Sequence, residues 1–161
     1  MSLVHEELKS LLTRQGADFR VVEHPAEGRT AYITQMRGNR LEQAIKSLVV
    51  QVRLSRRENR YCLANIPGDC RLDLEAIRLH FNADSAAMAP REKAQSLTGC
   101  VPGAIPPFSF NESLVLLADP LIRENEEVVF NAGRLDRSIF MNTGDYERIA
   151  APQWVKIALR G

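Results

Sequence analysis

The segment from Thr98 to Phe108 constrains the fold of this chain most strongly, because it holds two glycines and three prolines among apolar residues. Proline fixes φ and removes an amide donor, whereas glycine admits positive φ and a close approach of another main chain. Such a segment is too stiff for a linker, and its remaining amides could converge on a concavity that binds a carbonyl or an oxyanion. These amides belong to Gly99, Cys100, Val101, Gly103 and Ala104.

A simpler interpretation of this segment is a tight turn between a helix that ends near Thr98 and a strand that begins near Leu114. Glycine and proline are common turn residues for conformational reasons alone, so the pattern by itself favours this alternative. The segment has neither the G-x-x-x-x-G-K-[ST] nor the G-x-G-x-x-G spacing, which argues against the nucleotide-binding loops that these motifs form. The chain also lacks a G-x-S-x-G nucleophile elbow.

The length of the chain predicts a single domain that spans residues 1–161. Its charge does not indicate a strongly charged partner. The formal net charge is +1, so any contact with nucleic acid must be local. No stretch approaches the roughly 20 apolar residues of a membrane helix, and the first residues lack the apolar centre of a signal peptide. We therefore expect a soluble cytoplasmic protein that makes no contact with a membrane.

The cysteines and histidines are few and scattered, with no C-x-x-C pair. This spacing argues against a disulfide framework and against a structural zinc site, and we expect neither a metal nor a cofactor. These residues are Cys62, Cys70, Cys100, His5, His24 and His80.

Hydrophobic periodicity predicts helices and strands that are interspersed without strict alternation. The expected helices cover residues 3–15, 31–36, 74–81, 90–97 and 145–150, and the expected strands cover residues 19–23, 46–54, 60–66, 86–89, 114–118, 128–130 and 138–141. Asp73 is expected to cap a helix, Pro90 to be a first helical residue, and Asn131 to Gly133 to break a strand. The fold class is therefore α+β, as a mixed curved β-sheet flanked by helices.

Three features could carry chemistry, and each has a structural alternative. Lys46 begins an apolar strand, where its charge either extends to solvent or lies beside an anionic substrate; spacing alone favours solvent. Cys100 is more readily an inert small hydrophobe than a nucleophile. A group of arginines could contact phosphates, although Glu58 interrupts it and a solvated turn explains it equally well. These arginines are Arg53, Arg56, Arg57 and Arg60, with Arg37 and Arg40 upstream.

The order of several short motifs resembles the YbaK/ProX family, whose members are similar to the insertion domain of bacterial prolyl-tRNA synthetase. The resemblance covers essentially the whole chain and is closest to the YeaK-like branch. It is carried by a K-[ST]-L strand at Lys46 to Leu48, a G-x-x-P-G loop at Gly99 to Gly103, and an N-A-G segment at Asn131 to Gly133. Further matches are Glu23-His24, Ile66-Pro67-Gly68-Asp69, Arg71-Leu72-Asp73, Asp119, Ser138-Ile139, and, for the branch, residues 16–22 and 105–110.

The resemblance implies a trans-acting deacylase that cleaves the ester between a wrong amino acid and the 3′ end of a tRNA. A water would attack, assisted by the substrate's ribose hydroxyl, with no protein nucleophile. Partners would be the 3′ acceptor end of tRNA and an aminoacyl-tRNA synthetase. The implied catalytic residues are Lys46, Gly99 and Gly103, and the implied substrate-binding residues are His24, Ser47, Cys100, Val101, Pro102, Asn131, Gly133 and Ser138.

The family resemblance leaves the amino acid open. If Asn131 occupies the place of a histidine found in alanine-specific relatives, its amide favours a hydroxyl-bearing side chain, so serine or threonine is expected ahead of alanine or cysteine. Two alternatives remain from the sequence. One is a non-catalytic module that binds tRNA or a synthetase, and the other is a hydrolase that acts on another small acyl compound.

Overall fold

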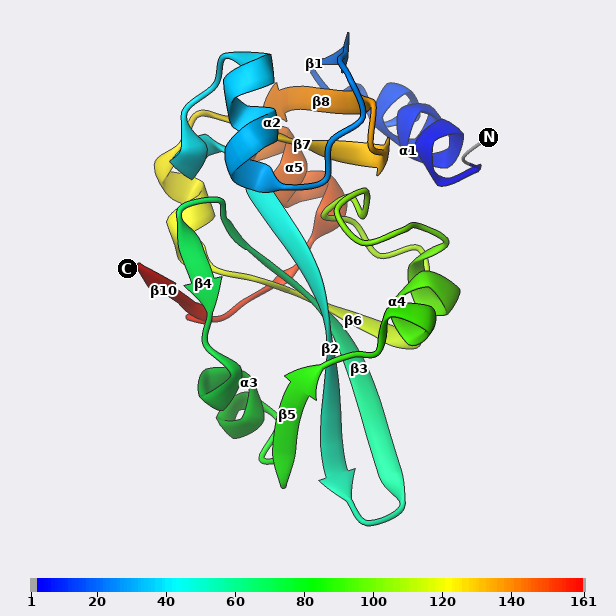
Figure 1. Ribbon diagram of the computed structural model, residues 1–161, viewed down its shortest axis with the longest axis vertical. Helices are drawn as coiled ribbons and strands as arrows, with labels where there is room; N and C mark the ends of the chain where they lie inside the picture. The colour runs from blue at the N-terminus through cyan, green and yellow to red at the C-terminus, as the bar shows by residue number, and fades with distance from the viewer. Residues whose placement is uncertain (1–2, 161) are drawn as a thin grey trace.

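The computed structural model describes residues 3–160, in which two sheets and a small strand pair are flanked by five helices (Figure 1). The helices are α1 (Leu3–Arg14), α2 (Thr30–Arg37), α3 (Leu74–His80), α4 (Arg91–Thr98) and α5 (Thr143–Ala150), with 3-10 turns η1 (Leu41–Gln43) and η2 (Pro120–Glu124). The strands are β1 (Phe19–Glu23), β2 (Ile45–Ser55), β3 (Glu58–Pro67), β4 (Cys70–Leu72), β5 (Ser85–Met88), β6 (Leu114–Ala118), β7 (Glu127–Arg134), β8 (Arg137–Asn142), β9 (Gln153–Trp154) and β10 (Ala158–Arg160).

The larger sheet has the strand order β5-β2-β3-β6-β9 and contains both pairing directions. Strands β2 and β3 form a long antiparallel hairpin, and β5 joins the outer side of β2. Strand β6 pairs in parallel with β3, and β9 pairs in parallel with β6. The β-branched and apolar residues of β2 suit a strand that is covered on both faces. This hairpin is the longest pairing in the chain, and it links the middle of the molecule to a projecting tip (Figure 1).

The smaller sheet, ordered β1-β8-β7, is antiparallel and lies beside α1 and α5 at the opposite end of the molecule from that tip (Figure 1). A single parallel bridge between Ala44 and Val129 connects it to the chain just before β2. The short pair β10-β4 fastens the end of the chain to the segment after the hairpin.

Residues 98–108, which we call the Gly/Pro segment, fill the space between these sheets with their apolar side chains. Ala104 and Ile105 are buried with Val49 and Leu63 in one core cluster, and Phe108 is buried in another. The Phe108 ring meets Phe130 and Tyr146 edge to face, with centroids 5.9 and 5.3 Å apart. The segment is therefore part of the core and not only a surface connection.

The predicted α+β class and mixed sheet are confirmed, and two local predictions are wrong. Residues 131–133 do not break their strand, because β7 continues to Arg134 and a register shift in its pairing with β8 accommodates Gly133 at φ +82°. Pro90 is the N-cap of α4 and lies one residue before the helix. Asp73 caps α3 as predicted, since its side chain accepts a hydrogen bond from the Ala76 amide.

Candidate functional site

A cavity of about 220 Å³ brings together α2, the start of β2, the tip of the Gly/Pro segment and β7. Its lining contains two cationic side chains and no carboxylate. We call it the cationic cavity, and its lining residues are Gly28, Thr30, Ile33, Arg37, Ile45, Lys46, Ser47, Leu48, Gly103, Ile105 and Asn131. The implied site residues Lys46, Ser47, Gly103 and Asn131 therefore lie together, although they are separated by up to 85 positions in the chain.

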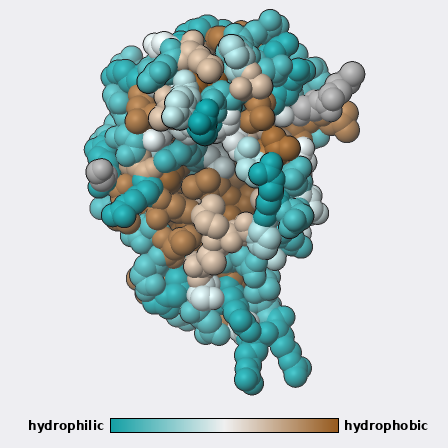
Figure 2. Space-filling view, in the orientation of Figure 1, coloured by the Kyte–Doolittle hydropathy of each residue, from teal (hydrophilic) through white to brown (hydrophobic). Residues whose placement is uncertain are grey.

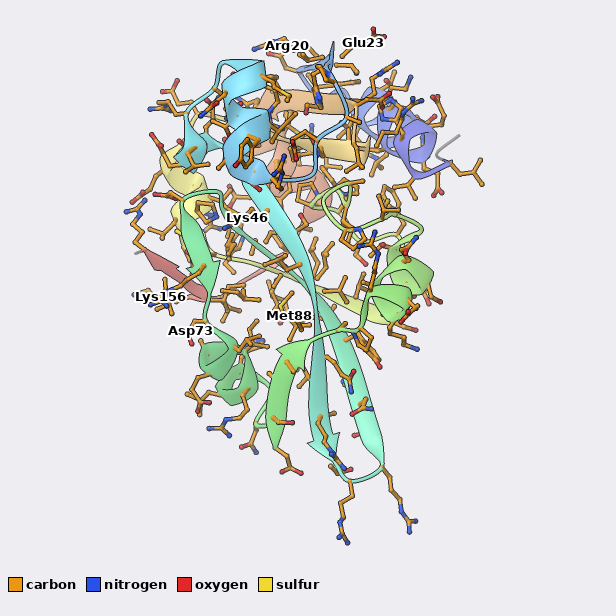
Figure 3. All side chains as sticks on the ribbon, in the orientation of Figure 1. Arg20, Glu23, Lys46, Asp73, Met88 and Lys156 are labelled. Atoms are coloured by element: carbon orange, nitrogen blue, oxygen red, sulfur yellow. The ribbon has the colours of Figure 1, made fainter. Side chains whose placement is uncertain are left out.

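Lys46 is half-buried at the upper end of β2, beside β4 (Figure 3). Its Nζ donates a hydrogen bond to the Cys70 carbonyl, and no carboxylate lies within ion-pair distance of it in the described chain. Burial lowers its pKa, which the nearby Cys70 and Asp69 partly offset. An ammonium group has three donors, so two remain available to a ligand.

Arg37 is the cationic residue of this cavity that sequence reasoning did not place there. It lies on the same face of α2 as Thr30 and Ile33, at the i+7 and i+4 positions of the helix. Its guanidinium donates hydrogen bonds to Asn39, Asn131 and Ser138, and it forms no ion pair with any carboxylate among residues 3–160. Desolvation by burial lowers its pKa to about 10. The helical spacing of Thr30, Ile33 and Arg37 is the sequence signal that could have placed Arg37 at this cavity.

Asn131 connects two loops through its side chain. Its Nδ2 donates to the Glu27 carbonyl at 2.9 Å and to the Gly103 carbonyl at 2.8 Å. Its Oδ1 accepts from the Ser138 hydroxyl at 3.1 Å and from Arg37 at 3.5 Å. Both amide hydrogens are used inside the protein, so Asn131 fixes the shape of the cavity and is poorly placed to donate to a substrate hydroxyl.

His24 and Ser138 lie behind this residue and do not line the cationic cavity. The Nε2 atom of His24 is 2.7 Å from the Ser138 hydroxyl oxygen, which also accepts a hydrogen bond from Arg37 at 2.9 Å. Ser138 therefore holds Arg37 and Asn131 by hydrogen bonds, and His24 holds Ser138, although neither His24 nor Ser138 lines the cavity. Their implied role in substrate binding is indirect in this geometry.

Gly103 is needed at the tip of the Gly/Pro segment for two separate reasons. Its φ is +89°, and a Cβ at this position would lie only 2.7 Å from the Gly28 Cα. Left-handed backbone is costly for residues other than glycine, and a main-chain neighbour cannot move aside as a flexible side chain can. The close approach of Gly28 and Gly103 therefore holds the two loops together at the cavity edge.

The expected convergence of the five main-chain amides on one concavity is wrong, because three of them already donate hydrogen bonds within α4 and the Gly/Pro segment and a fourth, that of Val101, belongs to a residue that does not line the cationic cavity. The Gly99 amide caps α4 by donating to the Gln95 carbonyl. The Cys100 amide donates to the Thr98 hydroxyl, and the Ala104 amide donates to the Val101 carbonyl. These donors are used because the segment must end a helix and close a turn within a few residues. In the described structure, only Val101 and Gly103 of the five keep an unused amide, and Gly103 alone of these two faces the cationic cavity.

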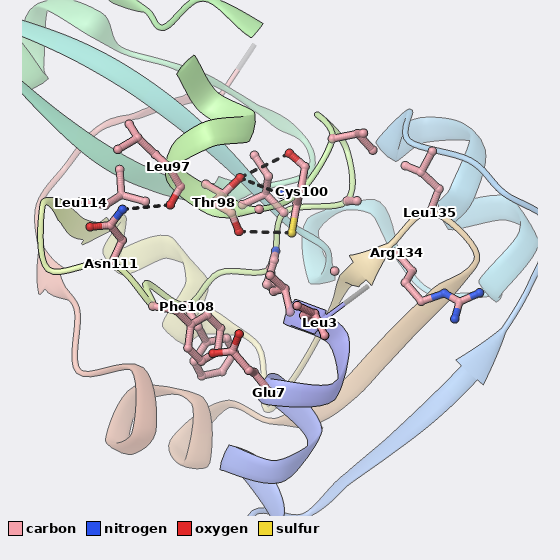
Figure 4. A pocket seen from close by; sticks show the side chains of 18 of the residues that line it. Leu3, Glu7, Leu97, Thr98, Cys100, Phe108, Asn111, Leu114, Arg134 and Leu135 are labelled. Carbon is pink, nitrogen blue, oxygen red and sulfur yellow. Dashed lines mark hydrogen bonds between the residues drawn. The ribbon is translucent and has the colours of Figure 1, made fainter. Parts of the chain in front are cut away.

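A larger cavity, of about 1010 Å³, lies on the other side of the segment, against α1 (Figure 4). Gly99, Cys100, Val101 and Gly133 face this space and not the cationic cavity, and Pro102 is exposed at the tip. The family resemblance implies that these residues share one site with Gly103, but the segment crosses between the two cavities. We call this the apolar cavity for the large hydrophobic residues in its lining, which also includes the charged residues Glu7, Glu112, Arg134 and Asp136. The hydrophobic residues are Leu3, Val4, Leu97, Ile105, Phe108, Phe110, Leu114 and Leu135.

Cys100 is buried in the wall of the apolar cavity, and its sulfur lies 3.6 Å from the Thr98 carbonyl (Figure 4). Burial raises the pKa of its thiol to about 11, so it is protonated near neutral pH. A protonated, buried thiol outside the cationic cavity is suited to packing and not to nucleophilic attack.

Ser47 and Asp119 show how differently two buried polar side chains are used. The Ser47 hydroxyl oxygen is inaccessible and lacks a hydrogen-bond partner among the described residues. Asp119, which supports the family resemblance, accepts hydrogen bonds from the amides of Leu121, Ile157 and Ala158. Asp119 therefore ties η2 to the end of the chain, and its role is structural.

Within residues 3–160 no three His, Cys, Asp or Glu side chains are grouped so that they could hold a metal ion. Among the same residues, no helix is both long and apolar enough to cross a membrane.

Comparison with known proteins identifies the family of this chain. A family model described as an aminoacyl-tRNA editing domain matches residues 24–149. A Multifunctional Ser/Thr-tRNA deacylase ProXp-y from Escherichia coli (strain K12) is 44% identical over 155 residues, which cover 96% of this chain and 92% of the relative.

Two solved structures share the fold at lower sequence identity. The crystal structure of a hypothetical protein superposes with a TM-score of 0.85 at 17% identity, covering 95% of this chain and 99% of the other. That of a protein proposed as a trans-editing enzyme for prolyl tRNA synthetase gives a TM-score of 0.80 at 23% identity, covering 99% of both chains. The family model and the 44% identical relative together show the family. The chain belongs to the aminoacyl-tRNA editing domain family.

Proposed function

We propose that this protein is a trans-acting aminoacyl-tRNA deacylase that acts in the cytoplasm on seryl or threonyl esters at the 3′ end of tRNA. The observation that carries the proposal is the placement of Lys46, Arg37 and the Gly103 amide around one cavity without a carboxylate. The name of the E. coli relative, a Ser/Thr-tRNA deacylase, supports the choice of these amino acids.

The reaction needs one water and no covalent intermediate with the protein. The water oxygen attacks the ester carbonyl carbon, the bond from that carbon to the ribose oxygen breaks, and the neighbouring ribose hydroxyl assists the proton transfers. The products are the free amino acid and a tRNA with an intact terminal ribose. Negative charge develops on the carbonyl oxygen during attack, where fixed donors in a water-poor site are most effective.

Three donors of the cationic cavity have hydrogen-bonding capacity left for the substrate. Lys46 uses one of its three N–H groups on the Cys70 carbonyl, and the Nη2 group of Arg37 has no partner in the described chain. The Gly103 amide is also unused. We assign the ester carbonyl to Lys46 and Gly103, and the hydroxyl of the amino acid to Arg37.

The test is the hydrolysis of a panel of tRNAs charged with serine, threonine, alanine or cysteine by the purified protein. We expect rapid release of serine and threonine and slower release of alanine and cysteine. Addition of the synthetase that produces each mischarged tRNA tests whether a synthetase partner raises the rate. Survival of all four esters at the uncatalysed rate, together with retained tRNA binding, would overturn the enzyme proposal and leave a binding module.

A further inference from the structure

The tip of the β2–β3 hairpin stands clear of the rest of the sheet (Figure 1). Strand β5 pairs with β2 only from Val50 to Arg53, and β6 begins to pair with β3 only at Tyr61. Residues 54–60 consequently have no neighbouring strand except each other. We call residues 53–60 the arm.

The arm carries four arginines against one glutamate, in a chain whose net charge is only +1. Arg53, Arg56, Arg57 and Arg60 are all exposed, and none forms an ion pair within the described chain. The acidic groups nearby are Glu58 in the arm and Asp84, whose amide donates to the Arg53 carbonyl. Arginines elsewhere are commonly paired with carboxylates, as are Arg20, Arg29, Arg40, Arg78, Arg123, Arg134, Arg137, Arg148 and Arg160.

Unpaired arginines on a projecting tip suit a phosphate-rich partner. A guanidinium presents paired donors that match a phosphate, and clustered like charges without counter-charges favour binding of a polyanion. The surface of the arm is hydrophilic, whereas hydrophobic residues gather across the middle of the same face (Figure 2). An apolar protein partner therefore has little to contact on the arm.

The arm and the cationic cavity are the two ends of one continuous hairpin. Lys46 and Ser55 are nine residues apart on β2, a span of about 30 Å in an extended strand. The pairing from Ile45 with Pro67 to Ser55 with Glu58 holds this distance. A ligand that fills both ends must be long, anionic along its length, and chemically distinct at its terminus.

We propose that the arm binds the phosphate backbone of the paired acceptor stem of the tRNA whose 3′ end enters the cationic cavity. This inference rests on the proposed function for its choice of nucleic acid. Guanidinium contacts to phosphates carry no direct sequence information, so the arm strengthens binding of any acceptor stem equally. Selectivity then stays with the cavity.

The experiment compares a variant with Arg56, Arg57 and Arg60 all changed to Gln with a control of equal charge change. The control changes Lys9, Arg14 and Arg148 to Gln; these residues lie on α1 and α5, at the far end of the molecule. Binding of uncharged tRNA is measured against salt concentration. We expect the arm variant to bind at least 10-fold more weakly, with a salt slope reduced by about 0.7 to 0.9 for each lost phosphate contact. The control keeps both values, and Glu58→Gln binds more tightly than the wild type.

A second substrate separates this proposal from the proposed function. Serine or threonine esterified to a short 3′-terminal oligonucleotide fills the cavity without reaching the arm, so the arm variant hydrolyses it at the wild-type rate. Unchanged tRNA affinity and salt slope in the arm variant would overturn the inference, as would an equal loss on the short substrate or weakened binding of a synthetase alone. If the wild type hydrolyses neither substrate, the deacylase proposal fails, while the tRNA-binding comparison still decides the role of the arm.

Discussion

The cavities on the two faces of the Gly/Pro segment differ both in volume and in whether their cationic side chains are paired with carboxylates. The apolar cavity on one face is the larger, at about 1010 Å³, and its arginine, Arg134, is paired with Asp136 at 2.8 Å. The cationic cavity on the other face has about 220 Å³, and neither Lys46 nor Arg37 in it pairs with a carboxylate in the described chain. Charge without a counter-charge, and not volume, distinguishes the site that is suited to an ester or a phosphate.

The same contrast explains why the segment needs glycine at two positions, Gly99 and Gly103, for different reasons. Gly99 ends α4 in the left-handed conformation, and its added Cβ would meet only the end of a Val4 side chain. Gly103 lies against the main chain of Gly28. The first glycine is a helix cap, whereas the second allows two loops to meet at the cavity edge.

Among substitutions at the two cavities, Lys46→Met is expected to have the largest effect on deacylation. Removing a donor aimed at developing negative charge lowers kcat by about 10²- to 10³-fold. The folded protein is not destabilised at neutral pH, because burial already lowers the pKa of Lys46 and so disfavours its charged form. Deacylation of the preferred tRNA and thermal unfolding are measured together.

The pH dependence of stability gives an independent check on Lys46. A folded-state pKa below the unfolded value means that the folded protein loses its proton first as pH rises. The stability of the wild type relative to Lys46→Met therefore increases with pH between the folded pKa and the ordinary value of 10.5. Unfolding of Lys46→Met at neutral pH would instead identify a structural lysine.

Gly103→Ala is expected to lower activity by about 10- to 100-fold, since a displacement of the cavity edge by about 1 Å is enough for such a loss. Left-handed backbone adds roughly 1–2 kcal/mol of destabilisation in both Gly103→Ala and Gly99→Ala. Gly99→Ala is the matched control, because its strain is similar and its neighbour is a side chain. Equal activity loss in both variants would mean that the two faces act as one site.

Arg37→Met is expected to lower kcat/KM for seryl- and threonyl-tRNA by about 10-fold, in the range of one hydrogen bond to a charged donor. Hydrolysis of the alanyl ester should be affected less, because the alanine side chain has no hydroxyl that Arg37 could bind. Arg134→Met, on the apolar side, removes a part-exposed ion pair and should change activity little. A uniform loss across all amino acids would contradict the role of Arg37 in selecting a hydroxyl.

The smallest effect is expected for Cys100→Ala, which should leave deacylation unchanged and lower stability only by the loss of a small buried group. The pKa of this thiol is raised to about 11 from 9.0, so alkylation by iodoacetamide at pH 8 should be slow in the folded protein. Loss of activity in Cys100→Ala without unfolding would return the cysteine to the list of catalytic candidates.

The sequence by itself determined the class of fold, the hairpin, the cap at Asp73 and the family. These follow from periodicity, turn chemistry and ordered motifs, which are properties of neighbouring residues. Lys46 and Gly103 were also singled out by their local setting, one charge before an apolar strand and one glycine in a rigid segment.

The tertiary structure alone decided which residues share a cavity. Gly99, Cys100 and Val101 are neighbours of Gly103 in the chain but face the opposite side, while Arg37 is distant in sequence and faces the same cavity. A segment that crosses between two packed sheets presents successive residues to different surroundings, and its amides are consumed by the helix end and turn that it must form. Periodicity within a segment cannot reveal this, because the two faces are defined by other parts of the chain that pack against them.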